Sequence, residues 1–118
     1  MGSMRTRRLG TQGLEVSALG LGTMGMSGVA GMPLMYGEPD EAEGIATIRR
    51  ALDLGVNFFD TAEVYGPYTN EILLGKALAG RRHEAVIATK FGFTYSLDNK
   101  ISGLDGRPEN VHKALDGC

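Results

Sequence analysis

The chain has 118 residues, of which 42% are hydrophobic and 22% are charged, the ordinary composition of one modest folded domain. Its 12 basic and 14 acidic side chains leave a formal net charge of −2, so it lacks the basic surface that nucleic acid or an anionic membrane would require. No apolar run approaches the ~20 residues that span a bilayer, and the polar start lacks the apolar segment of a signal peptide. The single cysteine is Cys118. We therefore expect a cytoplasmic protein without membrane or nucleic-acid partners.

The first part of the chain predicts a hairpin, a short strand and a long loop. Residues 6–9 and 14–17 flank Gly10-Thr11-Gln12-Gly13, a Gly-containing turn typical of a β-hairpin. Residues 18–21 form a short apolar segment that predicts a strand. Residues 22–39 are rich in Gly, Met, Ser and Pro and are too numerous for a plain connection, so we expect this loop to be functional or mobile.

After this loop, helical and strand-like segments alternate. Asp40 and Glu43 are spaced as in a capping box, apolar residues then recur at helical spacing, and Gly55 supplies a stop. Short apolar runs are typical of parallel strands that are buried on both faces. The pattern predicts a helix between Asp40 and Gly55, a strand over 56–59, a helix over 70–78, a strand over 85–89 and a helix over 108–115. This alternation predicts an α/β protein with a parallel sheet.

Two α/β architectures compete for this pattern. Gly20-Leu21-Gly22-Thr23-Met24-Gly25 matches the G-x-G-x-x-G motif of open dinucleotide-binding sheets, in which the last glycine opens a helix. Here the helix begins only near Asp40, and Asp60 lies far beyond the ~20 residues expected for a ribose-binding acid. We therefore favour a (β/α)8 TIM barrel, of which only the first three βα units plus an N-terminal β-hairpin are present, with the hairpin at the bottom of the barrel.

The predicted strands lead into residues that are suited to proton transfer. Asp60 and Lys90 follow neighbouring strands, which lie ~4.8 Å apart, so they can form an ion pair at the end of a barrel where catalysis occurs. A phenol at Tyr65 aimed at this ammonium would have its anion stabilised, which suits a general acid. Spacing alone equally fits a turn residue at Asp60, a packing residue at Tyr65 and a surface residue at Lys90.

Several stretches of the sequence, taken together, resemble the aldo-keto reductase family. In chain order they are GTQGLEVS and LGLGTM (residues 10–17 and 19–24), FFDTAEVYG (58–66), NEILLGKAL (70–78) and ATKFG (88–92). The resemblance covers nearly the whole chain and is closest to the bacterial and plant branch, whose members form oligomers. It implies that residues 4–118 are the amino-terminal part of such a barrel. Residues 1–3 precede a second methionine and are interpreted as a cloning scar.

The resemblance also implies an activity and a site. The expected reaction is the NADPH-dependent reduction of an aldehyde or ketone, a small-molecule carbonyl substrate, with Tyr65 as proton donor. Asp60 and Lys90 would tune Tyr65, and the backbone at Gly22, Thr23 and Met24, together with Asp60, would lie beside the nicotinamide ribose. No metal is expected, and the oligomeric state stays open, with a homo-oligomer among the alternatives. The choice between NADPH and NADH stays open, because phosphate-binding loops follow late barrel strands.

The chain departs from the family in two respects, the phosphate-binding loops, which are absent from it, and the catalytic histidine. The family's catalytic histidine ends a fourth strand, and we interpret His83 and His112 as surface residues that do not replace it. We therefore expect the 118 residues alone to be inactive and to self-associate, and a non-catalytic fragment with an interaction role is the alternative. A barrel enzyme that uses Lys90 as a Schiff-base nucleophile is disfavoured, because a lysine paired with Asp60 stays protonated.

Overall fold

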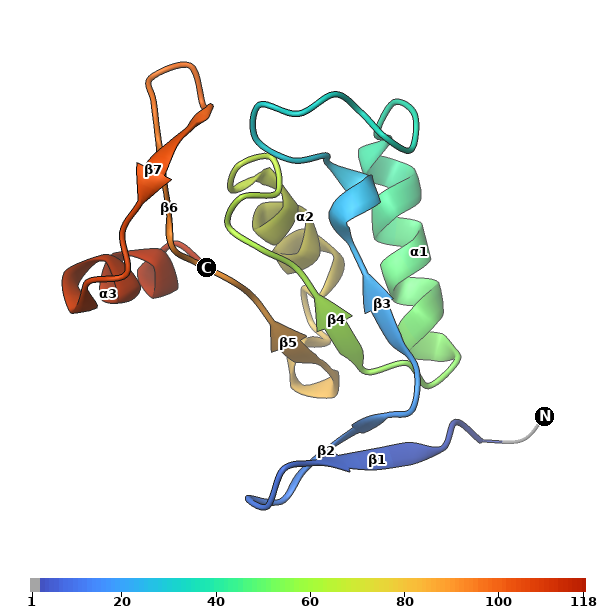
Figure 1. Ribbon diagram of the computed structural model, residues 1–118. Coiled ribbons are helices and arrows are strands. Elements are labelled where there is room, and N and C mark those ends of the chain that lie inside the picture. Colours follow the sequence, from blue (N-terminus) through green and yellow to red (C-terminus); the bar gives the residue numbers. More distant parts are fainter. Residues whose placement is uncertain (1–2) are drawn as a thin grey trace.

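The computed structural model describes residues 3–118, so Met1 and Gly2 of the interpreted cloning scar lie outside the described residues. The protein consists of a central parallel sheet packed against helices, with one antiparallel hairpin before the sheet in the chain and a second one after it, followed by a last helix (Figure 1). The strands are β1 (Thr6–Leu9), β2 (Leu14–Ser17), β3 (Gly20–Gly22), β4 (Phe58–Asp60), β5 (Val86–Ala88), β6 (Phe93–Tyr95) and β7 (Ile101–Leu104). The helices are α1 (Glu41–Asp53), α2 (Thr69–Ala77) and α3 (Pro108–Asp116), with short 3-10 turns at Met24–Met26 and Arg82–Glu84.

The central sheet has three parallel strands in the order β3-β4-β5. Gly22 pairs with Asp60, and Asp60 pairs with Ala88, so the carboxyl ends of the three strands meet at one edge. The fold is the α/β barrel type that the sequence predicts, and within residues 3–118 the sheet does not close into a barrel. This arrangement places the residues that follow each strand next to one another.

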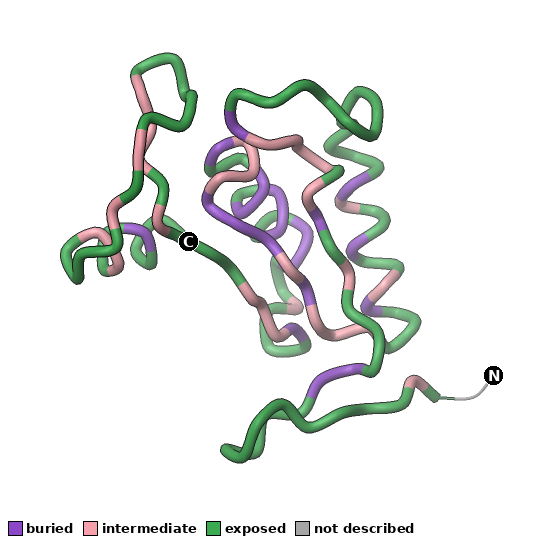
Figure 2. The backbone as a smooth tube through the Cα atoms, viewed as in Figure 1, coloured by how far each residue is buried: buried purple, intermediate pink, exposed green. Residues whose placement is uncertain are grey.

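Helices α1 and α2 pack against the sheet through a single core. Its buried members are Ile48, Leu52, Phe59, Leu74, Ala77, Leu78 and Ala85. Figure 2 shows that burial is concentrated around β4 and α2, while β6, β7 and the loop before α1 are mostly exposed or half-buried. Because β4 and the start of α2 are the best buried part of the chain, the loop between them has rigid anchors at both ends.

The predicted start and stop of α1 are confirmed. The side chain of Asp40 accepts a hydrogen bond from the backbone N–H of Glu43 (3.1 Å), which satisfies one of the free amides at the helix N-terminus. Gly55, just beyond the helix, adopts a positive φ of 92°, a conformation that glycine takes without steric cost.

The first hairpin lies at the amino ends of the parallel strands, as expected for the bottom of a barrel (Figure 1). The backbone N–H of Ser17 donates to Oδ1 of Asn57 (2.7 Å), and the backbone N–H of Asn57 donates to Oγ of Ser17 (3.0 Å). Val16, in β2 of this hairpin, is buried. The end of the sheet opposite the hairpin is therefore the end where chemistry is expected.

The sequence predictions need correction at two strands and at one hairpin. The strands predicted at 18–21 and 56–59 begin and end later, at Gly20–Gly22 and Phe58–Asp60, because the preceding residues belong to the connections from the hairpin and from α1. The hairpin formed by β6 and β7 was missed, since its strands have only three and four residues, too few to show a periodic pattern, and β7 contains Gly103. The loop over 22–39, which the sequence predicts to be functional or mobile, contains a 3-10 turn, and the N–H of Ala30 in it donates to the carbonyl of Val64 (2.9 Å).

Candidate active site

Asp60, Tyr65 and Lys90, the three residues predicted from the sequence, come together at the carboxyl end of the sheet. Asp60 is the last residue of β4, Lys90 follows β5, and Tyr65 lies in the loop between β4 and α2. The ammonium of Lys90 forms an ion pair with the Asp60 carboxylate and donates a hydrogen bond to the carbonyl of Thr61 (2.9 Å). It also lies 3.4 Å from the hydroxyl of Tyr65 and 5.1 Å from the centroid of its ring. The geometry therefore joins a carboxylate, an ammonium and a phenol in one chain of contacts.

The electrostatics keep the ammonium charged. Desolvation lowers the pKa of Lys90, but hydrogen bonds and charge interactions with Asp60 and Tyr65 outweigh it and raise this pKa above its ordinary value. The side chains of Lys90 and Asp60 are 53% and 48% exposed, so the pair contributes little to folding stability. A fixed cation beside a phenol stabilises the phenolate that forms when the phenol gives up its proton.

The loop that carries Tyr65 is tightly folded. The N–H of Tyr65 donates to the carbonyl of Ala62 (3.1 Å), and the N–H of Asn70 donates to the carbonyl of Tyr65 (3.2 Å). Gly66 has a φ of 116°, and a Cβ there would lie 1.9 Å from Oγ1 of Thr69 and 2.9 Å from its backbone nitrogen. Only glycine fits this position, so the loop backbone that presents Tyr65 is tightly constrained.

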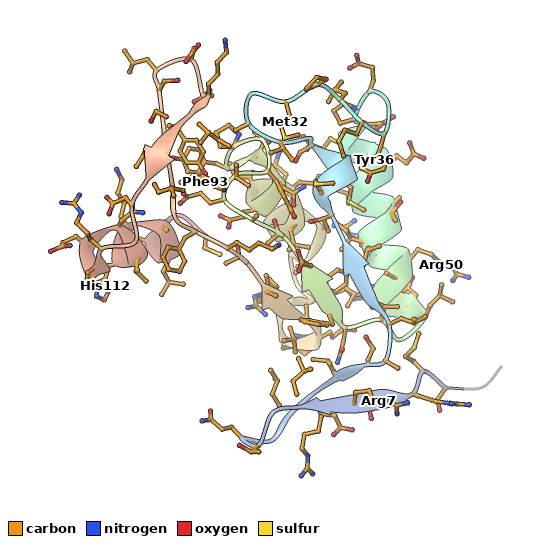
Figure 3. The ribbon with its side chains drawn as sticks, viewed as in Figure 1. Arg7, Met32, Tyr36, Arg50, Phe93 and His112 are labelled. Atoms are coloured by element: carbon orange, nitrogen blue, oxygen red, sulfur yellow. The ribbon has the colours of Figure 1, made fainter. Side chains whose placement is uncertain are left out.

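The residues predicted to lie beside a cofactor occupy the end of β3. Gly22, Met24, Gly25 and Tyr36 line an open hollow of about 340 Å³. Thr23 is buried, and its backbone N–H donates to the carbonyl of Asp60 (3.0 Å). The end of β3 is therefore attached directly to the residue that pairs with Lys90. Figure 3 shows Met32 and Tyr36 on the loop over this end of the sheet, with Phe93 on β6.

Sequence reasoning missed a buried polar network behind the site. Asn70 and Thr61 are fully buried and hydrogen-bonded to each other (2.7 Å), and Thr23 and Ser27 join the same network. The only signal in the sequence was an asparagine in the first turn of a helix, which is also the ordinary preference of that residue for helix starts. Nothing in the spacing of these residues predicts that they meet.

A second group of polar side chains lies between the loop and β6. Burial raises the pKa of Glu63, and its carboxyl faces the hydroxyl of Tyr95. That hydroxyl is buried and makes no hydrogen bond of normal geometry with the described part of the chain. The rings of Tyr68 and Tyr95 meet edge to face, with their centroids 5.5 Å apart. This group fastens the second hairpin to the loop that carries Tyr65.

The two histidines lie away from Asp60, Tyr65 and Lys90. His83 is exposed in the 3-10 turn before β5, and His112 is exposed on α3 (Figure 3), as the sequence predicts for surface residues. Among residues 3–118, no three His, Cys, Asp or Glu side chains are grouped so that they could hold a metal ion. None of the helices in this range has the length and apolar character needed to cross a membrane.

Comparisons with known proteins agree with this geometry. The model of the aldo/keto reductase family matches residues 18–117. An aldo-keto reductase from Bacillus halodurans in its holo form is 32% identical with a TM-score of 0.82, over 97% of this chain and 35% of that chain. A glycerol dehydrogenase from Gluconobacter oxydans is 34% identical with a TM-score of 0.72, over 98% of this chain and 34% of that chain.

A third solved structure, an aldo-keto reductase from Klebsiella pneumoniae in complex with NADPH, is 25% identical with a TM-score of 0.67, over 98% of this chain and 34% of that chain. The chain thus spans about a third of the length of the solved structures that it matches.

Proposed function

Because the chain belongs to the aldo/keto reductase family, we propose that it is the amino-terminal part of an NADPH-dependent enzyme that reduces aldehydes or ketones to alcohols. The observation that carries this proposal is the contact of the Lys90 ammonium with both the Asp60 carboxylate and the Tyr65 hydroxyl. This arrangement is suited to donating one proton to an oxygen that gains negative charge.

Each of the three residues has a separate part in the proposed proton transfer. The hydroxyl of Tyr65 donates its proton to the carbonyl oxygen of the substrate. The ammonium of Lys90 stabilises the phenolate that remains, and water then restores the proton. Asp60 holds the ammonium in place through their ion pair. Since the pKa of Lys90 is raised, this ammonium stays protonated throughout the neutral range.

The end of β3 supplies one side of the proposed cofactor site. Two glycines, Gly22 and Gly25, line the hollow there together with Met24 and Tyr36. A Cβ at Gly22 would meet no other atom within 4 Å, so the backbone at this position is open. This open backbone fits the close approach of a flat ring system. The bound nicotinamide would supply the hydride that reduces the carbonyl carbon. NADPH is proposed because the Klebsiella pneumoniae relative was solved with it. The residues that grip its phosphate would belong to later barrel units.

The Schiff-base alternative is less well supported. A nucleophilic lysine needs a lowered pKa so that the free amine is present near neutral pH. Ion pairing with Asp60 raises the pKa of Lys90 instead. The same lysine that suits an electrostatic role in reduction is therefore poorly suited to forming an imine.

The proposal is tested by removing the charge of Lys90 in a chain extended to full barrel length. We expect Lys90→Met to lower turnover of a carbonyl substrate with NADPH by at least ~100-fold, because the phenolate of Tyr65 loses its counter-charge. Lys76→Met is the matched control, since Lys76 also forms an exposed ion pair, with Glu41 at 2.9 Å, and among the described residues makes no hydrogen bond to Tyr65. Equal turnover of the two variants would refute the assigned role of Lys90.

A further inference from the structure

The side chain of Asn70 is the centre of the buried network behind the site. Asn70 lies in the first turn of α2 and has no solvent-exposed surface. Its carboxamide oxygen accepts hydrogen bonds from the hydroxyls of Thr23 (2.6 Å) and Thr61 (2.7 Å). Its amide nitrogen donates to the carbonyl of Thr23 (2.7 Å) and the hydroxyl of Ser27 (2.9 Å). An asparagine side chain has two lone pairs and two N–H groups to offer, so all of its hydrogen-bonding capacity is used.

The partners of Asn70 lead directly to all three residues of the candidate site. The hydroxyl of Thr61 contacts Asn70, and the backbone carbonyl of Thr61 accepts a hydrogen bond from the Lys90 ammonium (2.9 Å). Thr23 donates to the carbonyl of Asp60 from its backbone N–H (3.0 Å), and its hydroxyl, which lies 2.8 Å from the same carbonyl, shares its single proton between this carbonyl and the oxygen of Asn70. The backbone N–H of Asn70 itself donates to the carbonyl of Tyr65 (3.2 Å).

We propose that Asn70 is a positioning residue that holds Asp60, Tyr65 and Lys90 in register with the backbone at the end of β3. The inference rests on the proposed function, since it assigns to Asn70 the alignment of the proton donor with the cofactor side of the site. Asn70 contacts neither the ammonium nor the phenol hydroxyl, so it acts only through Thr23, Thr61 and the backbone of Tyr65.

The chemistry of the network explains why this residue is an asparagine. Only a side-chain amide offers an acceptor for two hydroxyls and two donors at the same time. An aspartate would keep the acceptor, lose both donors and bury a charge, and an alanine would leave the buried Thr61 hydroxyl without its partner and remove one partner each from Thr23 and Ser27. Hydrogen bonds in a buried network are strong and directional, so the loss of its centre displaces the attached backbone.

The test compares Asn70→Ala with Asn57→Ala in a chain extended to barrel length. Asn57 is a matched control, because its side-chain amide oxygen also joins distant segments by accepting a hydrogen bond from the N–H of Ser17 (2.7 Å), but at the opposite end of the sheet. Two quantities are measured for each variant: the pKa of Lys90, by NMR titration of isotope-labelled lysine, and the kcat and KM for a carbonyl substrate. The lysine titration requires only a folded protein and no turnover.

For Asn70→Ala we expect the pKa of Lys90 to fall toward its ordinary value of 10.5, because Asp60 and the Thr61 carbonyl move away from the ammonium. We also expect kcat to fall ~10- to 100-fold, with KM changed less than about threefold, since a small displacement of a catalytic group has this effect. Asn57→Ala lowers the melting temperature but leaves the Lys90 titration and kcat unchanged. An unchanged Lys90 titration and kcat in Asn70→Ala would overturn the inference.

A second variant covers the case in which Asn70→Ala does not fold. Thr61→Val removes a single hydroxyl from the network and keeps the carbonyl that accepts Lys90, so we expect smaller changes in the same direction, and none if the inference is wrong. If the parent protein reduces no carbonyl, the proposed function fails. The Lys90 titration still decides whether Asn70 positions the ammonium, so the two failures are distinguishable.

Discussion

Replacing Tyr65 with phenylalanine removes one oxygen atom, and the structure indicates how large the effect on catalysis is. Tyr65 carries the only hydroxyl that the Lys90 ammonium contacts among residues 3–118, at 3.4 Å. General-acid catalysis by a positioned side chain contributes ~10²- to 10⁴-fold to a rate, which is about 3–5.5 kcal/mol of barrier. The hydroxyl makes one long hydrogen bond at a half-buried position, so its loss costs less than about 1 kcal/mol of folding stability. Turnover and stability therefore separate in this variant.

The assay follows NADPH oxidation with a carbonyl substrate in a chain extended to barrel length, and NADPH binding by fluorescence titration. We expect Tyr65→Phe to lose at least ~100-fold in kcat and to keep its affinity for the cofactor. Tyr68→Phe is the matched control, because it removes a hydroxyl from the same loop with no contact to Lys90, and it should retain near-parental kcat. If Tyr65→Phe keeps more than about a tenth of the parental turnover, which means that the activation barrier rises by less than ~1.4 kcal/mol, the proton-donor role is wrong.

Four further predictions concern stability and assembly. Burial raises the pKa of Glu63 above 4.5, so the folded state binds the carboxyl proton more tightly than the unfolded state and loses stability as the pH rises above 4.5. Urea unfolding should therefore show Glu63→Gln to be more stable than the parent at pH 7, with no such gain below pH 4.5. Tyr95→Phe removes a buried hydroxyl without a partner of normal geometry, so unfolding should show it unchanged or ~1 kcal/mol more stable, and a large loss would reveal a hidden partner. Gly66→Ala should cost ~1–3 kcal/mol because of its positive φ and the contact with Thr69, whereas Gly75→Ala, which meets no atom within 4 Å, should cost nothing. Because β3 and β5 are open edges of the sheet, the 118 residues alone should sediment as self-associated species, and a cooperatively folding monomer would contradict this.

The site could be predicted from the sequence where it depends on strand ends. Asp60 and Lys90 each follow an apolar run, and the carboxyl ends of neighbouring parallel strands must meet at one edge of the sheet. The position of Tyr65 was harder to infer, because a loop residue is placed by its own turn and not by strand register. The resemblance to the family, more than the spacing, assigned this residue to the site.

The network around Asn70 could not be predicted, since it depends on tertiary structure. Thr23 and Asn70 are separated by 47 positions, and neither spacing nor periodicity links them. Asparagine near a helix start is also the ordinary signal of a cap, so its presence in the sequence did not predict that its side chain is buried. The hairpin of β6 and β7 was missed for a different reason: β6 follows β5 closely, and strands of three and four residues are too short to show a periodic pattern.

Transfer of hydride from the cofactor to a carbonyl carbon is the central claim of this account, and isotope tracing tests it most directly. The chain, extended to barrel length, is incubated with NADPH deuterated at the reactive ring carbon and with an aldehyde, and the alcohol is examined by mass spectrometry and NMR. The account predicts that the alcohol carries one deuterium on its carbinol carbon. It also predicts that the Tyr65→Phe variant forms almost none of this alcohol. An alcohol without deuterium, or no alcohol from the parent chain, would contradict the assignment as a carbonyl reductase.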